Sequence, residues 1–368
     1  MKDFNYWKKL HESEKLEEFS NDAIGLLWLK TKSIVRKELI AEFIKGNGIK
    51  LKETALAKQF VELFGLLSKD PTNSNKILDE YIKKENGKQV AKLDSVQLVS
   101  ELYKLKNFDW GGDYQNSLDK YLVRHYVKIH KSYDTLISKF ETEINVAVQG
   151  YVLNSWYNHW SSILIEHIFK SHSTVLPTVG QIKSVDFFIN NVPFDLKVTY
   201  LPAEFIKNKR KEKGYPVELT FLKKKAEEAK IIFDKKAKPA DVFYEIAEKM
   251  KDRNDEFCNG VLRTLKNEKL EILNEVQVNP KILATWLYEH QGEMRFGSEN
   301  RLFLVLVDTD DFNSSWKLKR NLDLLEPTII SYLDNFGTKK IDELKVSFNF
   351  KAKSQTFTAL TDIIFVVK

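Results

Sequence analysis

An uninterrupted apolar run near the C-terminal end is the most constraining feature of this 368-residue sequence. Leu302–Val307 reads Leu-Phe-Leu-Val-Leu-Val, with Arg301 before it and Asp308 after it. A run of this length without alternation predicts a strand that is buried on both faces. Such strands occur in sheets covered by other layers, so the rest of the chain is expected to supply those layers.

The segments upstream predict helices and a β-hairpin. Residues from about 140 to His172 have the pattern of one long helix. Val185–Ile189 and Val192–Tyr200 are rich in β-branched and aromatic residues, and Asn190-Asn191 between them is typical of a tight turn. Further strands are expected at residues 344–350 and 363–367. Helix, hairpin, helix and buried strand together predict an α/β (α+β) fold.

The first 140 residues predict a helical region. Apolar residues recur there at helical spacing, and helix ends are expected at breakers such as Gly46–Gly48 and Asn86-Gly87. With 43% hydrophobic and 12% aromatic residues, the chain cannot be largely disordered. We therefore expect two parts, a helical region at 1–140 and a second domain at 141–368.

The single cysteine and the lack of a predicted membrane span limit the cellular compartments that this chain would suit. Cys258 alone excludes an intramolecular disulfide framework and argues against a cysteine-based zinc site. The segment Ile144–Ile165 has no Asp, Glu, Lys or Arg, but its many amide and hydroxyl side chains predict a buried amphipathic helix, not a membrane span. No targeting segment is visible, and we expect a cytoplasmic protein with no membrane partner.

The predicted hairpin carries ionisable residues inside apolar strands. Asp195 and Lys197 are two positions apart, so their side chains share one face of the second strand. Asp186, in the first strand, can reach the same face. Two converging carboxylates form an oxygen-rich site suited to Mg²⁺, and a neighbouring lysine can orient a water molecule. This combination suits the hydrolysis of a phosphodiester.

These residues resemble the PD-(D/E)xK nuclease superfamily. The resemblance consists of Val185-Asp186, eight intervening residues and Asp195-Leu196-Lys197, in the order helix, hairpin, helix, strand over roughly residues 145–310. The proline that precedes the first aspartate in the family is replaced by Val185. The resemblance implies a restriction-endonuclease-like core, with a central mixed sheet flanked by helices, and catalytic roles for Asp186, Asp195 and Lys197.

The long helix adds a third acidic residue. Glu166 is the only acidic residue between Glu143 and Asp186. In the superfamily the corresponding helix often carries a glutamate of the metal site, so the resemblance implies Asp186, Asp195 and Glu166 as ligands of Mg²⁺, with Mn²⁺ as a substitute. The alternative for Glu166 is an ordinary position on the helix surface.

A rival copy of the motif lies near the C-terminal end. Asp334 precedes Glu343-Leu344-Lys345 by the interval that separates Asp186 from Asp195. However, Asp334 is predicted at the end of a helix and Glu343 at the exposed start of a strand. The hairpin carboxylates are embedded among apolar residues, where a carboxylate is costly unless it binds a metal or a partner. That difference favours the hairpin.

Positive charge is concentrated after the hairpin. Residues 207–238 contain 12 basic and 5 acidic residues, a net charge of +7 against +6 for the whole chain. Such a local excess suits a polyanion, although a solvated surface is the alternative. The expected contacts to nucleic acid are Lys207, Lys209, Arg210, Lys211, Lys223, Lys224 and Lys225.

A polar, glycine-containing stretch precedes the buried strand. Its Arg295, Asn300 and Arg301 are candidates for contacts to bases or phosphates. Equally, the two arginines could pair with Glu293 or Glu299.

The expectation from the sequence is therefore a Mg²⁺-dependent endonuclease acting on double-stranded DNA, with a type II restriction enzyme as the best match. Cutting both strands symmetrically would favour a homodimer. The alternatives are a repair, phage or defence nuclease of the same superfamily without strict specificity, and a non-catalytic nucleic-acid-binding protein on a nuclease-like core.

Overall fold

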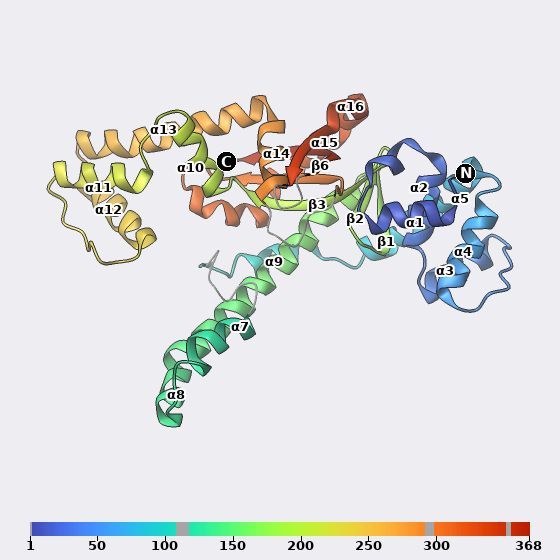
Figure 1. The fold of residues 1–368 in the computed structure, drawn as a ribbon, viewed down its shortest axis with the longest axis horizontal. Coiled ribbons are helices and arrows are strands. Elements are labelled where there is room, and N and C mark those ends of the chain that lie inside the picture. Colours follow the sequence, from blue (N-terminus) through green and yellow to red (C-terminus); the bar gives the residue numbers. More distant parts are fainter. Residues whose placement is uncertain (1, 108–117, 291–297, 351–354) are drawn as a thin grey trace. The chain divides into compact units, whose positions relative to one another are not determined.

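The computed structural model describes residues 2–107, 118–290, 298–350 and 355–368. Its strands form one six-stranded sheet in the order β1-β2-β3-β4-β6-β5. Strands β1, β2, β3 and β6 are labelled in Figure 1. β4 and β6 are parallel, whereas β1–β2, β2–β3 and β5–β6 are antiparallel. The strands are β1 (Val175–Ile182), β2 (Val185–Ile189), β3 (Val192–Tyr200), β4 (Arg301–Val307), β5 (Lys345–Phe350) and β6 (Gln355–Val367). The predicted α/β fold with a mixed sheet flanked by helices is confirmed.

Helices precede the sheet, as predicted, and no strand occurs before β1 among the described residues. Asn86-Gly87, expected to end a helix, instead lies inside α5. There the side chain of Asn86 is buried and donates to the carbonyl oxygen of Lys170, 2.9 Å away. The helices are α1 (Phe4–Glu12), α2 (Ala23–Ser33), α3 (Lys37–Gly46), α4 (Leu56–Leu67), α5 (Pro71–Val90), α6 (Ser95–Leu102), α7 (Leu118–Leu122), α8 (Tyr133–Lys139) and α9 (Asn145–Ser171).

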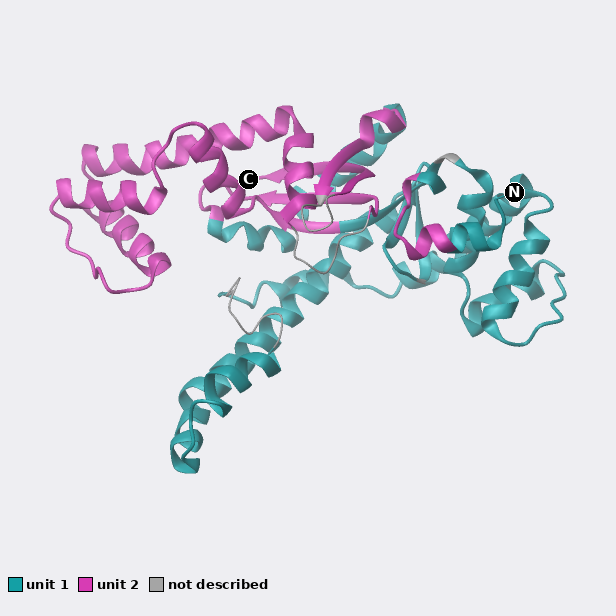
Figure 2. Cartoon of the chain, in the orientation of Figure 1, with its two compact units in different colours: residues 1–8, 18–196, 313–338 teal, residues 9–17, 197–312, 339–368 magenta. Residues whose placement is uncertain are grey.

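The chain divides into two compact units (Figure 2). Unit 1 consists of residues 1–8, 18–196 and 313–338, and unit 2 of residues 9–17, 197–312 and 339–368. The boundary predicted near residue 140 falls inside unit 1, because α9 packs against α5, α6 and β1. The sequence position of a helix start therefore does not mark the edge of a compact unit here.

In unit 1 the hairpin packs through its aromatic residues. Phe187 of β2 stacks on Phe169 of α9, with ring centroids 5.1 Å apart. Phe194 of β3 meets Phe336, which follows α15 (Leu322–Asn335), edge to face at 5.9 Å. All four rings are buried. This face of the hairpin is consequently part of the core.

A segment distant in sequence, residues 313–338, joins unit 1 through buried polar groups. Arg320, at the end of the 3₁₀ segment η4 (Phe312–Arg320), donates to the carbonyl oxygens of Leu102 and Leu105, where α6 ends. A cation at this position satisfies carbonyls that have no helical partner. The adjacent Lys319 donates to Asn158 of α9 at 2.9 Å, and burial lowers its pKa to about 8.

Unit 2 contains the predicted buried strand and a separate helical cluster. Every residue of β4 is buried, as the apolar run predicts. Its core is formed by β4, β5 and β6 with α10, α13 and α14. A second cluster joins α11, α12 and the first half of α13, and it includes Cys258. These helices are α10 (Ala203–Glu212), α11 (Glu218–Glu228), α12 (Pro239–Arg253), α13 (Glu256–Val278) and α14 (Pro280–His290), and a short helix α16 (Ile341–Leu344) precedes β5.

Among the described helices, none combines the length and the apolar character that crossing a bilayer requires.

A glycine in β1 permits close packing and yields the first prediction. A Cβ atom on Gly180 would lie 2.3 Å from the carbonyl oxygen of Ser33, at the end of α2. Gly180→Ala should therefore destabilise the protein by at least about 1–3 kcal/mol, the usual cost of overpacking. Gly65→Ala, in α4 with nothing within 4 Å of the added atom, is the matched control. It should be neutral or stabilising by up to about 1 kcal/mol in urea unfolding. Equal effects of the two variants would contradict this packing.

The buried Lys319 yields a pH prediction. Its pKa is lower in the folded state, about 8 against the usual 10.5, so between these values the unfolded chain binds more protons. Stability should therefore rise with pH across this range by about 3 kcal/mol from this group. Lys319→Met should lack that rise when urea unfolding is followed at pH 7, 8, 9 and 10. The same pH slope in both proteins would contradict the assignment.

Candidate functional site

The β2–β3 hairpin closes through a two-residue turn. Asn190 and Asn191 both have positive φ, 47° and 65°. This is the left-handed geometry of a type I′ turn, which asparagine tolerates better than most residues. The turn pairs Ile189 with Val192, followed by Phe188 with Pro193 and Phe187 with Phe194. The hairpin predicted from the sequence is confirmed, including its turn.

The register of the hairpin determines what its two faces carry. Continuing the observed pairing by one step sets Asp186 opposite Asp195. Directly opposed residues have side chains on the same face, and neighbours along a strand alternate between faces. Since Phe187 and Phe194 face the core, Asp186 and Asp195 belong to the other face. Lys197, two residues beyond Asp195 in the same continuous strand, shares that face.

The two aspartates have different environments. Asp195 is buried, with 8% of its surface exposed, whereas Asp186 is half-buried. Oδ2 of Asp186 accepts a hydrogen bond from the backbone N–H of Leu196, 2.8 Å away. This bond crosses from one strand to the other and holds the carboxylate beside Asp195. Lys197 is half-buried.

The predicted third carboxylate does not join this pair. Oε2 of Glu166 in α9 is 2.6 Å from Nζ of Lys170, one helical turn away. Within the described ranges, no group of three or more His, Cys, Asp or Glu side chains is gathered closely enough to hold a metal ion. Of the three predicted ligands, Asp186 and Asp195 are therefore the two that the hairpin holds near each other. Mg²⁺ suits such a site, because it commonly uses one or two carboxylates and completes its shell with water and phosphate oxygens.

A buried lysine that the sequence analysis did not single out supports the hairpin turn. Nζ of Lys30 in α2 lies 2.8 Å from Oδ1 of Asp79 in α5 and 3.3 Å from Oδ1 of Asn191. The Lys30 side chain is only 2% exposed. A cleft of about 460 Å³ between α2 and α5 borders these residues. Lys30 thus positions the turn, and a lysine directly after the apolar run Ile24–Leu29 was the signal available in the sequence.

The rival motif is used for local structure. Asp334 lies near the end of α15, as predicted. Its Oδ1 is 3.2 Å from Nε2 of His172, within hydrogen-bonding distance. Glu343 lies in α16, not at the start of a strand, and its side chain accepts from the backbone N–H of Lys340 at 3.1 Å. Glu343 therefore serves as a helix cap.

Part of the predicted basic surface is neutralised by an acidic stripe on α13. Glu268, Glu271 and Glu275 recur at helical spacing and face the basic residues of α10 and its C-terminal end. Lys209 and Lys213 both bond Glu275, and these hydrogen bonds hold the pKa of Glu275 below its usual value. The charge excess read from the sequence is thus partly offset by residues about 60 positions away.

Arg210 requires a correction. Its side chain is 2% exposed, and its guanidinium pairs with Glu268 and donates to the carbonyl oxygen of Pro216 at 3.0 Å. A buried, paired arginine does not offer its charge to a nucleic acid. Its position on the inner face of α10 explains this, because α10 packs against α13.

The remaining predicted lysines differ in how much charge they leave for a ligand. Lys207 pairs with Glu204, and Lys225 pairs with Glu228 at 2.6 Å. Lys211 and Lys224 are exposed and Lys223 is half-buried. In the part of the chain that the structure describes, these three form no ion pair.

The residues predicted at the start of β4 also require a correction. Asn300 is fully buried, and its Oδ1 accepts from the backbone N–H of Leu360 at 3.0 Å. Arg301 is 4% exposed and pairs with Glu299 at 2.7 Å. Both residues stabilise the joined ends of β4 and β6 instead of facing a ligand. Arg295 lies outside the described residues.

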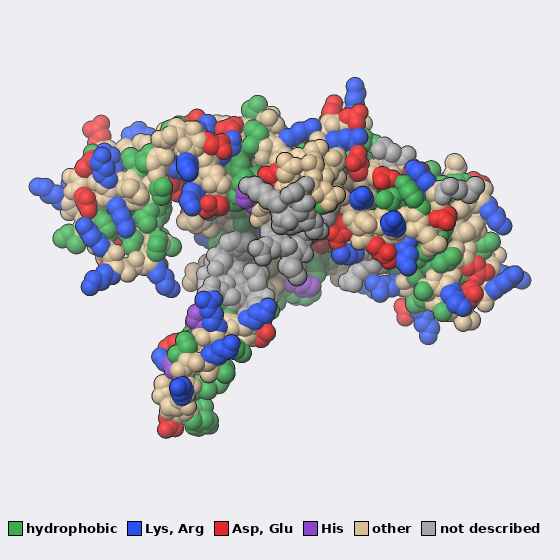
Figure 3. Space-filling view, in the orientation of Figure 1, with side chains coloured by type: hydrophobic (Ala, Val, Ile, Leu, Met, Phe, Trp, Pro, Cys, Tyr) green, Lys and Arg blue, Asp and Glu red, His purple; other side chains and the backbone are tan. Residues whose placement is uncertain are grey.

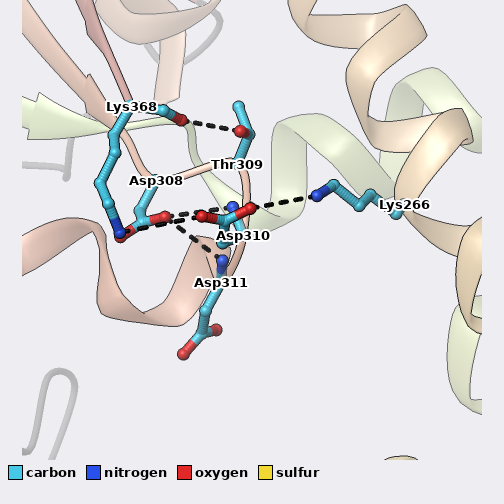
Figure 4. A network of polar contacts seen from close by, with 6 residues as sticks. All are labelled: Lys266, Asp308, Thr309, Asp310, Asp311 and Lys368. Carbon is cyan, nitrogen blue, oxygen red and sulfur yellow. Dashed lines mark hydrogen bonds and ion pairs between the residues drawn. The ribbon is translucent and has the colours of Figure 1, made fainter.

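A second acidic cluster occurs where β4 ends (Figure 4). Oδ2 of Asp308 is 3.0 Å from Nζ of Lys368, and Oδ1 of Asp310 is 3.3 Å from Nζ of Lys266. The hydrogen bond to Asp308 raises the pKa of Lys368. Asp308 also accepts from the backbone N–H groups of Asp310 and Asp311. This network holds the loop after β4, and its two lysines offset two of its three carboxylates.

The chain matches no family model, no curated protein and no solved structure. The arrangement of the hairpin carboxylates is therefore the basis on which a function can be argued.

Proposed function

We propose that this protein is a metal-dependent endonuclease that hydrolyses phosphodiester bonds of double-stranded DNA, with a PD-(D/E)xK-like active site. The observation that carries the proposal is the hairpin register, which pairs Phe187 with Phe194 and, continued by one step, would set Asp186 opposite Asp195. The hydrogen bond from the Leu196 N–H to Oδ2 of Asp186 agrees with this placement, and Lys197 shares the face of Asp195 by strand alternation. A divalent cation held by both carboxylates would carry charge opposite to theirs, and it would bring the phosphate of the substrate to the same place.

Each residue of the hairpin has a distinct role in this reaction. Hydrolysis joins a water oxygen to phosphorus and breaks the bond from phosphorus to the leaving sugar oxygen. The attacking water gives up a proton to solvent, and the leaving sugar oxygen takes a proton from solvent and departs as a hydroxyl group. Asp186 and Asp195 would hold Mg²⁺, which supplies positive charge against the developing negative charge on the phosphate. Lys197 would orient the attacking water and stabilise the same charge through its ammonium group.

The apolar face of the hairpin supports this role by keeping the strands in register. Phe187 and Phe194 are clamped by rings from α9 and from the segment after α15. The carboxylates therefore stand on a rigid platform, which a preorganised site requires. The most specific form of this proposal is a type II restriction enzyme that acts as a homodimer in the cytoplasm.

Substitutions in the hairpin test the proposal directly. Asp186→Asn, Asp195→Asn and Lys197→Met should each lower Mg²⁺-dependent cleavage of plasmid DNA by roughly 10³-fold, equivalent to about 4 kcal/mol of transition-state stabilisation. Glu343→Gln, in the rival Glu-Leu-Lys motif, is the matched control and should cut at the parent rate. Parent-rate cleavage by a folded Asp195→Asn protein would refute the site.

The products distinguish the forms of the proposal. End sequencing of the cut DNA should give one recurrent sequence for a restriction enzyme, and scattered ends for a nuclease without strict specificity. EDTA should abolish either pattern. DNA that is retarded in a gel but never cut, with Mg²⁺ or Mn²⁺, would identify a non-catalytic DNA-binding protein instead.

The unpaired lysines generate a separate prediction on binding. Lys211→Gln, Lys223→Gln and Lys224→Gln together should weaken binding to all DNA sequences and flatten the slope of log K against log salt by about 1–3, or roughly 0.9 for each lost phosphate contact. Lys213→Gln is the control, because this lysine already pairs with Glu271 and Glu275. An unchanged slope in the triple variant would show that these lysines do not contact DNA.

A further inference from the structure

Residues 118–153 form a helical segment with an unusual surface. The segment comprises α7, the π-helical turn η2 (Val123–Val127), α8, a second π-helical turn η3 (Phe140–Ile144) and the first residues of α9. α7 contacts α9, so the segment doubles back on itself (Figure 1). From Tyr133 onward, α8, η3 and α9 follow one another without a break. We refer to residues 118–153 as the α7–α9 segment.

The α7–α9 segment buries little of its apolar surface. Of its apolar side chains only Tyr126, Ile144 and Ala147 are buried. It holds nine of the twenty exposed large hydrophobic residues in the described chain, although it makes up about a tenth of the sequence. These nine are Val123, Val127, Ile129, Tyr133, Ile137, Phe140, Val146, Val152 and Leu153. Hydrophobic side chains are visible at the surface there (Figure 3). An exposed apolar surface on this scale marks an interaction site.

The exposed residues follow helix faces. Tyr133, Ile137 and Phe140 recur at intervals of four and three, and Val146 and Leu153 are seven residues apart. Side chains at these spacings line one side of a helix, as they do where helices pack together. Tyr133 is 75% exposed, which leaves nearly all of its ring for a partner. The pattern fits a partner that also presents helices.

The charges of the segment identify that partner. Residues 118–131 carry Lys120, Arg124, Lys128 and Lys131 against one acid, whereas residues 133–153 carry Asp134, Glu141 and Glu143 against one base. One half is therefore basic and the other acidic, and the sum is only +1. A nucleic acid or an anionic membrane would favour a uniformly basic surface. A second copy, turned by a two-fold axis, would present its acidic half to the basic half of the first.

We propose that the α7–α9 segments of two copies of this chain pack together in a two-fold symmetric dimer. In such an isologous contact each surface meets itself, so a segment that is basic in one half and acidic in the other is self-complementary. Two helical pairs then form a four-helix arrangement that buries the exposed stripe. An interface of ordinary size uses about 20–30 residues from each partner, which this 36-residue segment can supply. The inference depends on this surface and is independent of the proposed nuclease activity.

The first test uses the full chain and its mass in solution. Sedimentation equilibrium from 1 to 100 µM should give twice the 43.0 kDa mass of one chain for the parent protein. Ile137→Glu should weaken association at least tenfold without changing thermal unfolding of the monomer, because this side chain is already 45% exposed. Ile232→Glu, the same change at an 86% exposed site outside the segment, should remain dimeric.

A charge exchange separates self-association from other occupants. Arg124→Glu with Lys128→Glu makes both halves acidic, and Asp134→Lys with Glu141→Lys makes both basic. Each variant alone should be monomeric, and an equimolar mixture should form a heterodimer. A monomeric parent protein, a dimer insensitive to Ile137→Glu, or a failure of the mixture to associate would overturn the proposal. Association is measured separately from cleavage. A monomer that cuts DNA would refute the dimer and the homodimeric form of the proposed function but not the nuclease, and a dimer that does not cut would refute the nuclease alone.

Discussion

The turn at Asn190-Asn191 is the constraint on which the candidate site depends. Its two left-handed residues allow strands β2 and β3 to meet after only two loop residues, and this pairs Ile189 with Val192. Every later pair follows from that first one. Because side chains alternate with a period of two, a slip of one residue would turn Asp195 into the core and a phenylalanine out of it. Thus the conformation of two asparagines decides which face carries the carboxylates.

The hairpin is held from several distant parts of the chain. Phe169 precedes it in α9, and Phe336 follows it by more than a hundred residues, yet both rings pack on the same apolar face. Lys30, from α2, reaches the turn itself. The aspartates therefore occupy a surface whose backbone is fixed by contacts from three helical regions. The proposed site would need such support, because two carboxylates can share a cation only where their backbones are held in place.

Ion pairs between distant segments, more than local composition, determine where this chain exposes net charge. The net +7 of residues 207–238 suggested an extended basic surface, but the acidic stripe of α13 binds Lys209, Arg210 and Lys213. Burying Arg210 beside Glu268 is tolerable because the pair is compensated, and breaking it would leave an uncompensated charge. The α7–α9 segment shows the opposite situation, since its basic and acidic halves are largely exposed. Local charge counts thus describe a surface only after the partners across helices are known.

Some parts of the fold were predictable from the local sequence pattern. Other parts were not, because single residues interrupt the pattern there. The hairpin, the buried β4 and the long helix α9 follow from periodicity and from turn chemistry. β1 was not expected, because Pro177 and Gly180 interrupt its strand pattern, although both suit its place at the edge of the sheet. Asn86-Gly87 looked like a helix end, but the bond from Asn86 to Lys170 keeps α5 helical there. In α5 a contact with a distant segment overrode the local preference, and in β1 the pairing with β2 did so.

By itself the sequence determined the strand and helix types, the hairpin turn and the alternation that sets Asp195 and Lys197 on one face. These properties follow from backbone geometry over a few residues, which the order of side chains records directly. Only the tertiary structure decided that Asp186 accepts a hydrogen bond from the Leu196 N–H, that Glu166 pairs with Lys170, and that Arg210, Asn300 and Arg301 are buried. The physical reason is that burial and ion pairing depend on which distant segments meet. The free energy that decides which segments meet is spread over many contacts, so no local sequence pattern predicts it.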